Sequence, residues 1–168
     1  LRPVESGEMT LNGENLVGAS PRKISDAGVA HIPEDRSRDG MVKGMTVAEN
    51  LMLNSYHRKP FSSGVTLNRS AIEAAAEKIV KDFDVRTPSI HTDIASLSGG
   101  NQQKVLISKW LGTNPSILLL DEPSNHLDLE ATLWLESFLK AYPGMMVVIS
   151  HERDLLNNVV DNILHLEG

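Results

Sequence analysis

The chain has 168 residues, of which 40% are hydrophobic and 23% charged, and this balance is typical of one globular domain. Sixteen basic residues stand against 22 acidic ones, so the net charge of −6 argues against broad affinity for nucleic acid or anionic membranes. Because cysteine is absent, disulfides and the usual structural zinc site are excluded. No apolar run is long enough to cross a bilayer and no leader segment is found, so we expect a cytosolic protein.

The first half of the chain predicts short elements separated by turns. An Asn-Gly pair, which accepts the positive φ of a tight turn, predicts a hairpin over 9–16. A Ser-Pro start and a closing glycine predict a helix over 20–28, and an extended segment over 29–32 follows. A capping box at Thr46 opens a second helix, and apolar residues at helical spacing predict a third helix over 68–83.

The second half of the chain alternates between helical and strand patterns. The predicted helices run over 98–109, 129–142 and 152–159, and the predicted strands over 117–120, 145–149 and 163–166. The strand over 145–149 is expected in the interior of the sheet. This alternation predicts an α/β fold with a mostly parallel sheet between flanking helices. Segment 59–64 is expected to be a flexible loop.

A serine and two glycines form a candidate phosphate-binding turn. Ser98-Gly99-Gly100 stands where a helix begins, so unpaired backbone N–H groups, the seryl hydroxyl and the positive end of the helix dipole can face a phosphate. The alternative is an ordinary serine cap after a Gly-Gly turn. The motifs that follow at the expected distance favour the phosphate site.

Two carboxylates follow the buried strand pattern over 117–120. That strand would carry Asp121 and Glu122 to the C-terminal edge of the sheet, where ligands bind in open α/β folds. One carboxylate suits a Mg²⁺ ion and the other a reacting water. A solvated strand end is the alternative. His151 follows the next strand, where an isolated histidine would otherwise be a surface or capping residue.

Taken in order, these motifs resemble the C-terminal two-thirds of an ATP-binding cassette (ABC) ATPase. They are Leu97-Ser98-Gly99-Gly100-Asn101-Gln102-Gln103, Ile117-Leu118-Leu119-Leu120-Asp121-Glu122-Pro123, Leu127-Asp128 and Ser150-His151. The resemblance implies a P-loop NTPase-like cassette with a helical signature subdomain at about 45–105 and a core part at about 106–168. No Gly-x-x-x-x-Gly-Lys-Ser/Thr phosphate loop (Walker A) occurs, so we expect a fragment that lacks the N-terminal strand and that loop.

The same resemblance implies ATP and Mg²⁺ as the bound species. Glu122 would orient or deprotonate the attacking water, and His151 would donate a hydrogen bond to the γ-phosphate. Asp121 would hold Mg²⁺, and Glu34 is a second candidate ligand. The expected contacts to nucleotide held by an opposing cassette are Ser98, Gly99, Gly100, Asn101, Gln102 and Asp128.

The segment around Glu34 departs from the usual family pattern. Glu34 aligns with the glutamine of the family's glutamine loop, and its negative charge near phosphates makes normal turnover doubtful. A surface position without function is the alternative. Nearby, Arg36, Arg38 and Lys43 form a basic cluster whose simplest interpretation is a solvated loop, with contact to a partner subunit as the sharper one.

The two halves of the chain resemble different branches of the family. Residues 1 to about 110 resemble the second cassette of importers for simple sugars and nucleosides, of which Glu34 is typical. From about Ser116 the chain resembles ABC proteins that act on ribosomes, with a join in 110–115.

The first function hypothesis is the ATP-hydrolysing subunit of a nucleoside or sugar importer. It implies a second cassette in a head-to-tail dimer or tandem, membrane permease subunits, and a place at the inner face of the cell membrane. The alternatives are a soluble ribosome-associated ATPase, which alone would bring contact with nucleic acid, and a non-hydrolysing cassette that lends its signature motif to a partner site. The isolated fragment is expected to be inactive because the phosphate loop is absent.

Overall fold

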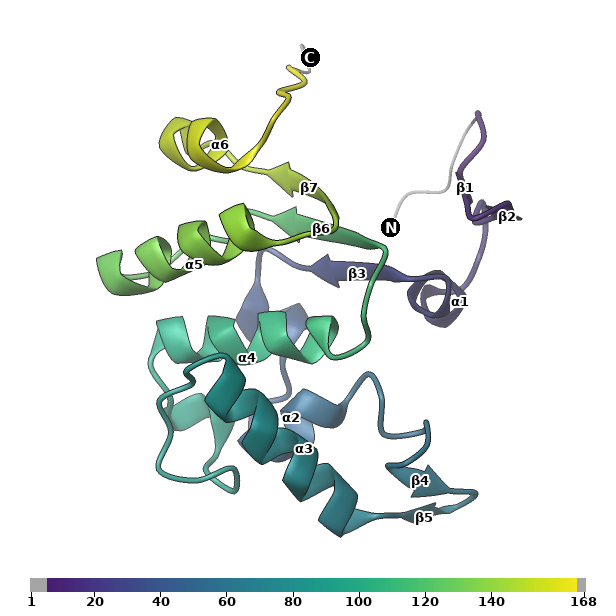
Figure 1. The fold of residues 1–168 in the computed structure, drawn as a ribbon, viewed down its shortest axis with the longest axis vertical. Coiled ribbons are helices and arrows are strands. Elements are labelled where there is room, and N and C mark those ends of the chain that lie inside the picture. The colour runs from purple at the N-terminus through teal and green to yellow at the C-terminus, as the bar shows by residue number, and fades with distance from the viewer. Residues whose placement is uncertain (1–5, 166–168) are drawn as a thin grey trace.

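The computed structural model describes residues 6–165, and a three-stranded parallel sheet lies at its centre (Figure 1). The strand order is β3 (Val29–Ile32), β6 (Ile117–Asp121) and β7 (Met145–Ile149). Both pairings are parallel, and β6 lies in the middle. The alternation of helices and strands therefore predicted the fold class correctly.

Helices cover one face of this sheet. The helices of the sheet layer are α1 (Pro21–Asp26), α4 (Gly99–Leu111), α5 (Leu129–Ala141) and α6 (Arg153–Val159). Apolar residues of α4, α5 and α6 meet the inward side chains of the strands in one buried cluster, to which α1 contributes no residue. Its members are Ala30, Ile32, Leu106, Ile107, Leu118, Leu120, Leu135, Leu139 and Leu155. Residues from before and after the predicted join at 110–115 thus share one core.

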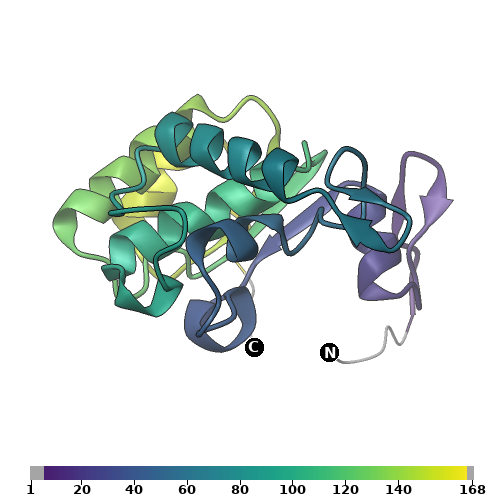
Figure 2. The same cartoon turned by 90° about the horizontal axis from the view of Figure 1, so that it is seen from below.

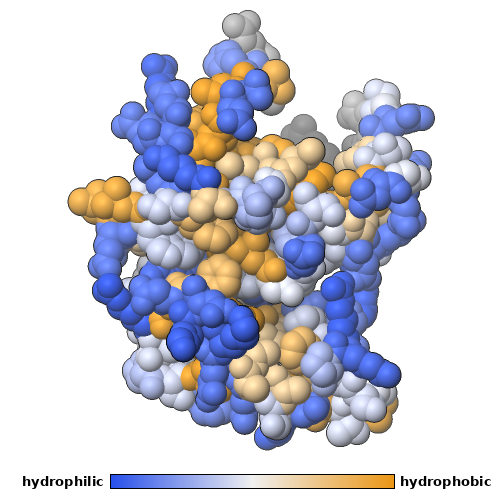
Figure 3. Space-filling model, viewed as in Figure 1, coloured by the Kyte–Doolittle hydropathy of each residue, from blue (hydrophilic) through white to orange (hydrophobic). Residues whose placement is uncertain are grey.

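The opposite face of β7 is open in the described part of the chain. Met145, Val147 and Ile149 are 65%, 48% and 50% exposed, and Figure 3 shows apolar surface between α6 and the C-terminal segment. The expectation of an interior strand over 145–149 is therefore wrong for residues 6–165, where β7 is the edge strand. The aliphatic run predicts burial on both faces, yet only one face finds a covering layer.

The predicted strand over 163–166 does not form across residues 163–165, and Leu166 lies outside the described residues. Ile163 and Leu164 are 61% and 83% exposed. A strand needs a neighbour to complete its hydrogen-bond ladder, and within 6–165 this segment pairs with none. An apolar sequence alone was therefore a poor guide here.

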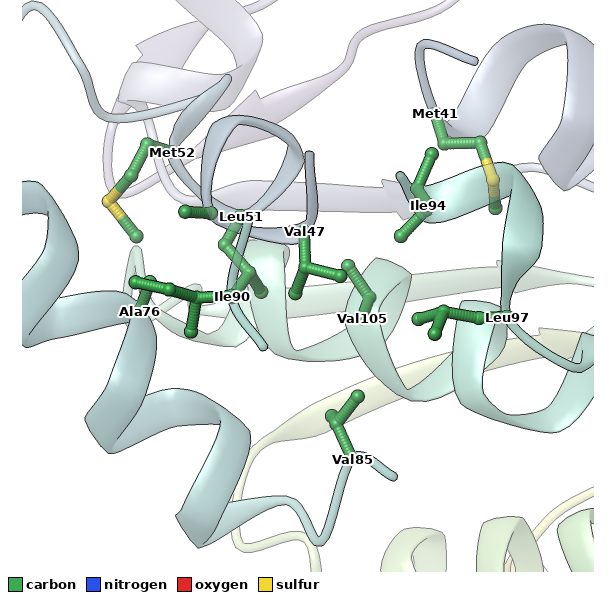
Figure 4. Packing of buried hydrophobic residues seen from close by; sticks show 11 residues of the cluster. Met41, Val47, Leu51, Met52, Ala76, Val85, Ile90, Ile94, Leu97 and Val105 are labelled. Atoms are coloured by element: carbon green, nitrogen blue, oxygen red, sulfur yellow. The ribbon is translucent and has the colours of Figure 1, made fainter. Parts of the chain in front are cut away.

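A second cluster lies under the helices α2 (Val47–Met52) and α3 (Arg69–Asp82), which pack beside α4 (Figures 2 and 4). Its buried members are Met41, Val47, Ala48, Leu51, Met52, Ala76, Val85, Ile90, Ile94, Leu97 and Val105. α4 contributes Val105 to this cluster and Leu106 and Ile107 to the sheet cluster. The predicted boundary at about 105 stays a prediction, and α4 runs across it.

Two short hairpins, the short π-helix η1 (Arg36–Gly40) and a short 3₁₀ helix complete the described structure. β1 (Thr10–Leu11) pairs with β2 (Glu14–Asn15) as predicted, and β4 (Ser62–Ser63) pairs with β5 (Thr66–Leu67). The second hairpin begins inside the segment expected to be a flexible loop. The 3₁₀ helix covers Ile94–Ser96. Within the described residues, no helix is both long and apolar enough to cross a membrane.

Candidate functional site

Four of the predicted site residues gather where the parallel strands end. Asp121 is the last residue of β6, Glu122 follows it, and Glu34 and His151 lie just beyond β3 and β7. We call these four residues the acidic edge. Glu34 and Asp121 line one cleft of about 740 Å³. The carboxyl ends of neighbouring parallel strands meet at one edge, as the sequence predicted.

Glu122 is held in place by the segment that follows β7. Its backbone N–H donates to the Ile149 carbonyl at 2.8 Å, and its carboxylate accepts from the Ser150 hydroxyl at 3.1 Å. The same carboxylate lies 2.9 Å from Nδ1 of His151 and accepts from the His151 backbone N–H at 3.1 Å. The Glu122 backbone has a φ of 42°, in the left-handed region, so this contact network supports an unusual conformation.

The contact with Glu122 raises the pKa of His151 above its ordinary value. The hydrogen bond to Glu122 is the largest cause, and the negative charge of Glu122 comes next. The imidazole is otherwise open, since its side chain is 72% exposed while that of Glu122 is 16% exposed. A protonated His151 therefore pairs with a carboxylate that remains largely shielded from water.

The acidic edge fits a Mg²⁺ ion that is also bound by phosphate. Within residues 6–165 no group of three or more histidine, aspartate or glutamate side chains could hold a metal alone. Mg²⁺ typically takes one or two carboxylates and completes its shell with water and substrate phosphates. Asp121 and Glu34 line the same cleft and could supply those carboxylates.

The serine-diglycine turn begins α4, as the sequence predicted. Ser98 is the N-cap, and its hydroxyl accepts from the Asn101 backbone N–H at 3.4 Å and from the Asn101 side chain at 2.9 Å. A Cβ atom added to Gly100 would lie 2.7 Å from Cβ of Ala131, so only glycine fits there. We call residues 98–101 the signature turn.

Asp128 lies beside the signature turn. It caps α5 by accepting from the Ala131 backbone N–H at 2.8 Å. Together with Ser98, Gly100 and Asn101 it lines a cavity of about 140 Å³. The structure therefore brings together four of the six residues expected to contact nucleotide.

Gln102 faces its own subdomain instead. Its side-chain amide donates to the carbonyls of Ile94 and Leu97 at 3.2 and 3.0 Å, so it holds the turn that precedes α4. The next residue, Gln103, is buried and donates to the Pro123 carbonyl at 2.9 Å. Sequence reasoning missed Gln103, because adjacent glutamines on a helix give no signal of which one reaches a distant loop.

The expectation of a solvated basic loop is wrong for Arg36. Its guanidinium is partly buried and donates to the carbonyls of Asn125 and His126 at 2.9 and 3.2 Å. Burial lowers the pKa of Arg36, and the nearby charge of Asp35 opposes that shift. Arg38, in contrast, has a side chain that is 79% exposed and pairs with Asp39.

Glu34 and Asp121 of the acidic edge and the signature turn line separate cavities, and Glu122 and His151 line neither of the two. The cleft beside Asp121 and the cavity beside Ser98 have no lining residue in common. A phosphate in one cavity of this chain would therefore not lie in the other. This separation agrees with the expectation that the two groups act on different nucleotides.

A parallel sheet with carboxylates at its C-terminal edge, next to a helix that opens on Ser-Gly-Gly, defines the chain as part of an open α/β domain, a class in which ligands bind at that edge. The chain belongs to the ABC transporter family, whose model matches residues 1–125. A solved dimer of an ATP-binding cassette in a post-hydrolysis state, bound to ADP and Pi, has the same fold. The TM-score is 0.71 at 19% identity, over 94% of this chain and 68% of that chain.

Curated relatives match both halves of the chain. The guanosine import ATP-binding protein NupO of Bacillus subtilis is 35% identical over 97% of this chain and 32% of its own length. The nucleoside import ATP-binding protein NupA of Lactococcus lactis is 38% identical, with 97% and 33% covered. The xylose import ATP-binding protein XylG of Thermoanaerobacter pseudethanolicus is 37% identical, with 95% and 32% covered. The chain thus spans about a third of the length of these relatives.

Proposed function

We propose that the chain is part of the ATP-binding and ATP-hydrolysing subunit of an importer for nucleosides or simple sugars. The observation that carries the proposal is the contact between Glu122 and His151 at the ends of adjacent strands, 2.9 Å apart. A shielded carboxylate beside an open imidazole suits a general base and a hydrogen-bond donor. The named import functions of the three relatives supply the transport part.

Within this proposal, the acidic edge performs the chemistry of hydrolysis. Glu122 orients the attacking water and takes its proton, and His151 donates a hydrogen bond to the γ-phosphate. Asp121 and Glu34 would hold Mg²⁺, which would supply positive charge to neutralise the phosphates. The Ser150 hydroxyl holds the Glu122 carboxylate, and the Ile149 carbonyl of β7 holds the Glu122 backbone N–H. The carboxylate therefore needs to move little during the reaction.

The signature turn acts on a nucleotide held by a second cassette. Ser98, Gly99, Gly100 and Asn101 present backbone N–H groups and a hydroxyl to the phosphates, and Asp128 adjoins that contact. The two separate cavities support a head-to-tail arrangement, in which each edge meets the other cassette's turn. Membrane permease subunits would complete the importer, the cassettes would lie at the inner face of the membrane, and ATP binding would close the two cassettes.

The ribosome-associated alternative rests on sequence from Ser116 onward. The importer relatives align over 95–97% of the chain, and both halves pack in one core, which favours the importer. The non-hydrolysing alternative concerns the chain by itself, because no phosphate loop occurs in its 168 residues. We therefore expect the isolated chain to be inactive.

The proposal is tested with the complete protein and its permease in liposomes. We expect uptake of a labelled nucleoside or sugar into liposomes that enclose MgATP and whose cassettes face the lumen. The 168-residue chain alone serves as the negative control and should show no micromolar MgATP binding by calorimetry, since it lacks the loop that cradles the β- and γ-phosphates. ATP hydrolysis stimulated by ribosomes but not by the permease would contradict the importer.

A further inference from the structure

The guanidinium of Arg36 lies where three segments meet, and the proposed function gives each of these segments a separate role. Arg36 begins the short π-helix η1 (Arg36–Gly40), two residues after Glu34. It donates through Nη1 to the Asn125 carbonyl and through Nη2 to the His126 carbonyl, 2.9 and 3.2 Å away. These two carbonyls lie in the loop that connects Glu122 with the N-cap of α5. The planar fork of arginine matches two consecutive acceptors, which the ammonium of lysine cannot do.

The third segment is the signature turn. A Cβ atom added to Gly99 would lie 2.7 Å from Nη2 of Arg36 and 3.4 Å from the His126 carbonyl oxygen. The guanidinium thus occupies the space that a side chain at position 99 would need. The loop with Glu34, the loop with His126 and the first turn of α4 therefore meet at one side chain.

The loop held by Arg36 has a conformation that needs support. Glu122 and His126 both have left-handed backbones, with φ of 42° and 59°, which residues other than glycine adopt rarely. Two internal bonds close its turns, from Asn125 N to Glu122 O and from Leu127 N to Ser124 O, both 3.1 Å. The carbonyls of Pro123, Asn125 and His126 are held from outside the loop by Gln103 and Arg36.

The segment that carries Arg36 is itself fixed along α4. Its last residue, Gly40, packs so closely on Leu106 that a Cβ would lie 2.9 Å from a methyl carbon. Lys109, one turn further on, donates to the Gly40 carbonyl. Burial lowers the pKa of Lys109 to about 8, so this contact lies in a dry environment. η1 is therefore anchored at both ends, by Arg36 and by Gly40.

We propose that Arg36 is a positioning residue, which sets the loop between Glu122 and Asp128 against the signature turn and the Glu34 segment. The inference rests on the proposed function and deepens it. If Glu34 moved, Arg36 would move with it and would shift the carbonyls that it bonds in the loop that ends at Asp128. The chemistry at Glu122 and the contact at Asp128 then depend on a side chain that lines the cleft of Glu34 and Asp121 and bonds the loop between Glu122 and Asp128.

The experiment compares Arg36→Ala and Arg36→Lys with Arg22→Ala in the complete protein. Arg22 is the matched control, because it is an exposed arginine on α1 that lines neither the cleft of Asp121 nor the cavity of Ser98. Amide hydrogen exchange of the peptide covering 122–128 is measured without nucleotide, and ATPase kcat and KM are measured separately. Arg36→Lys keeps charge and stem, so it folds even if Arg36→Ala does not.

We expect both Arg36 variants to speed exchange in 122–128 and to lower kcat, by about tenfold or more for Arg36→Ala, with KM within about threefold. Arg22→Ala should leave exchange and kcat unchanged. Exchange as slow as in the unmodified protein, or an unchanged kcat in Arg36→Lys, would overturn the positioning role. If the unmodified complete protein does not hydrolyse ATP, the proposed function fails instead, and the exchange data still decide whether Arg36 holds the loop.

Discussion

The acidic edge and the signature turn are built by opposite means. At the acidic edge, charged side chains bond one another: Glu122 accepts from Ser150 and His151, and Asp121 and Glu34 line one cleft. At the signature turn, the important feature is the lack of side chains, since a methyl group at Gly100 would meet Ala131 at 2.7 Å. The acidic edge depends on ionisable side chains, whereas the signature turn depends on the space left by its glycines.

This difference teaches how each region should respond to substitution. Exchanging a carboxylate for an amide of equal size changes charge and basicity at the acidic edge without changing its volume. Adding one methyl group at the signature turn changes volume without changing charge. We therefore expect substitutions at the acidic edge to lower the rate of hydrolysis, and substitutions at the signature turn to lower the stability of the fold.

The largest expected effect comes from Glu122→Gln in the complete protein. Loss of the general base should lower kcat for ATP hydrolysis by about a hundred- to ten-thousand-fold, while MgATP binding is retained. Steady-state turnover and nucleotide titration measure the two quantities. The matched control is Glu73→Gln, which neutralises an exposed carboxylate on α3 and should leave both unchanged. Equal turnover in the Glu122 and Glu73 variants would remove Glu122 from its proposed role.

The second prediction concerns the packing of the signature turn and its effect on stability. Gly100→Ala should destabilise the protein by about 1–3 kcal/mol, because the new methyl group overlaps Cβ of Ala131 and neither atom can rotate away. Gly99→Ala should cost less, because the atom it meets is the end of the long Arg36 side chain, which can move aside at the cost of its hydrogen bonds to the loop. Urea unfolding of the complete protein gives both free energies of unfolding. If Gly99→Ala proved the more destabilising, rigid packing would not be what selects glycine at 100.

The parts of the fold that the sequence predicted well are those with local causes. Ser98 and the Thr46 capping box act within three residues, and both form as expected. The acidic edge was also predictable, because aliphatic runs identify parallel strands and parallel strands end at one edge. Local capping and strand order thus determine most of the candidate site.

The parts that could not be predicted depend on contacts between distant segments. Arg36 and Asn125 are 89 positions apart, and no spacing rule links them. Gln103 likewise reaches Pro123 across 20 positions. The exposure of β7 has a different cause. An aliphatic pattern indicates that a strand prefers apolar contacts, but it does not show whether a second layer covers that strand. Local sequence preferences determine where helices and strands form, and contacts between distant segments determine which of their residues are buried or bonded.

The smallest expected effect concerns protonation at the acidic edge, the property that the signature turn lacks. The hydrogen bond to Glu122 raises the pKa of His151 above 6.5. A raised folded-state pKa means that the pair contributes its stability fully below the unfolded value and loses it as pH rises through the folded value. NMR titration of the His151 ring should report the raised pKa, and Glu122→Gln should return it toward 6.5. Glu152→Gln is the matched control, because Glu152 raises the pKa of His151 less than Glu122 does. An equal fall in both variants would mean that general negative charge, and not the Glu122 contact, sets the protonation of His151.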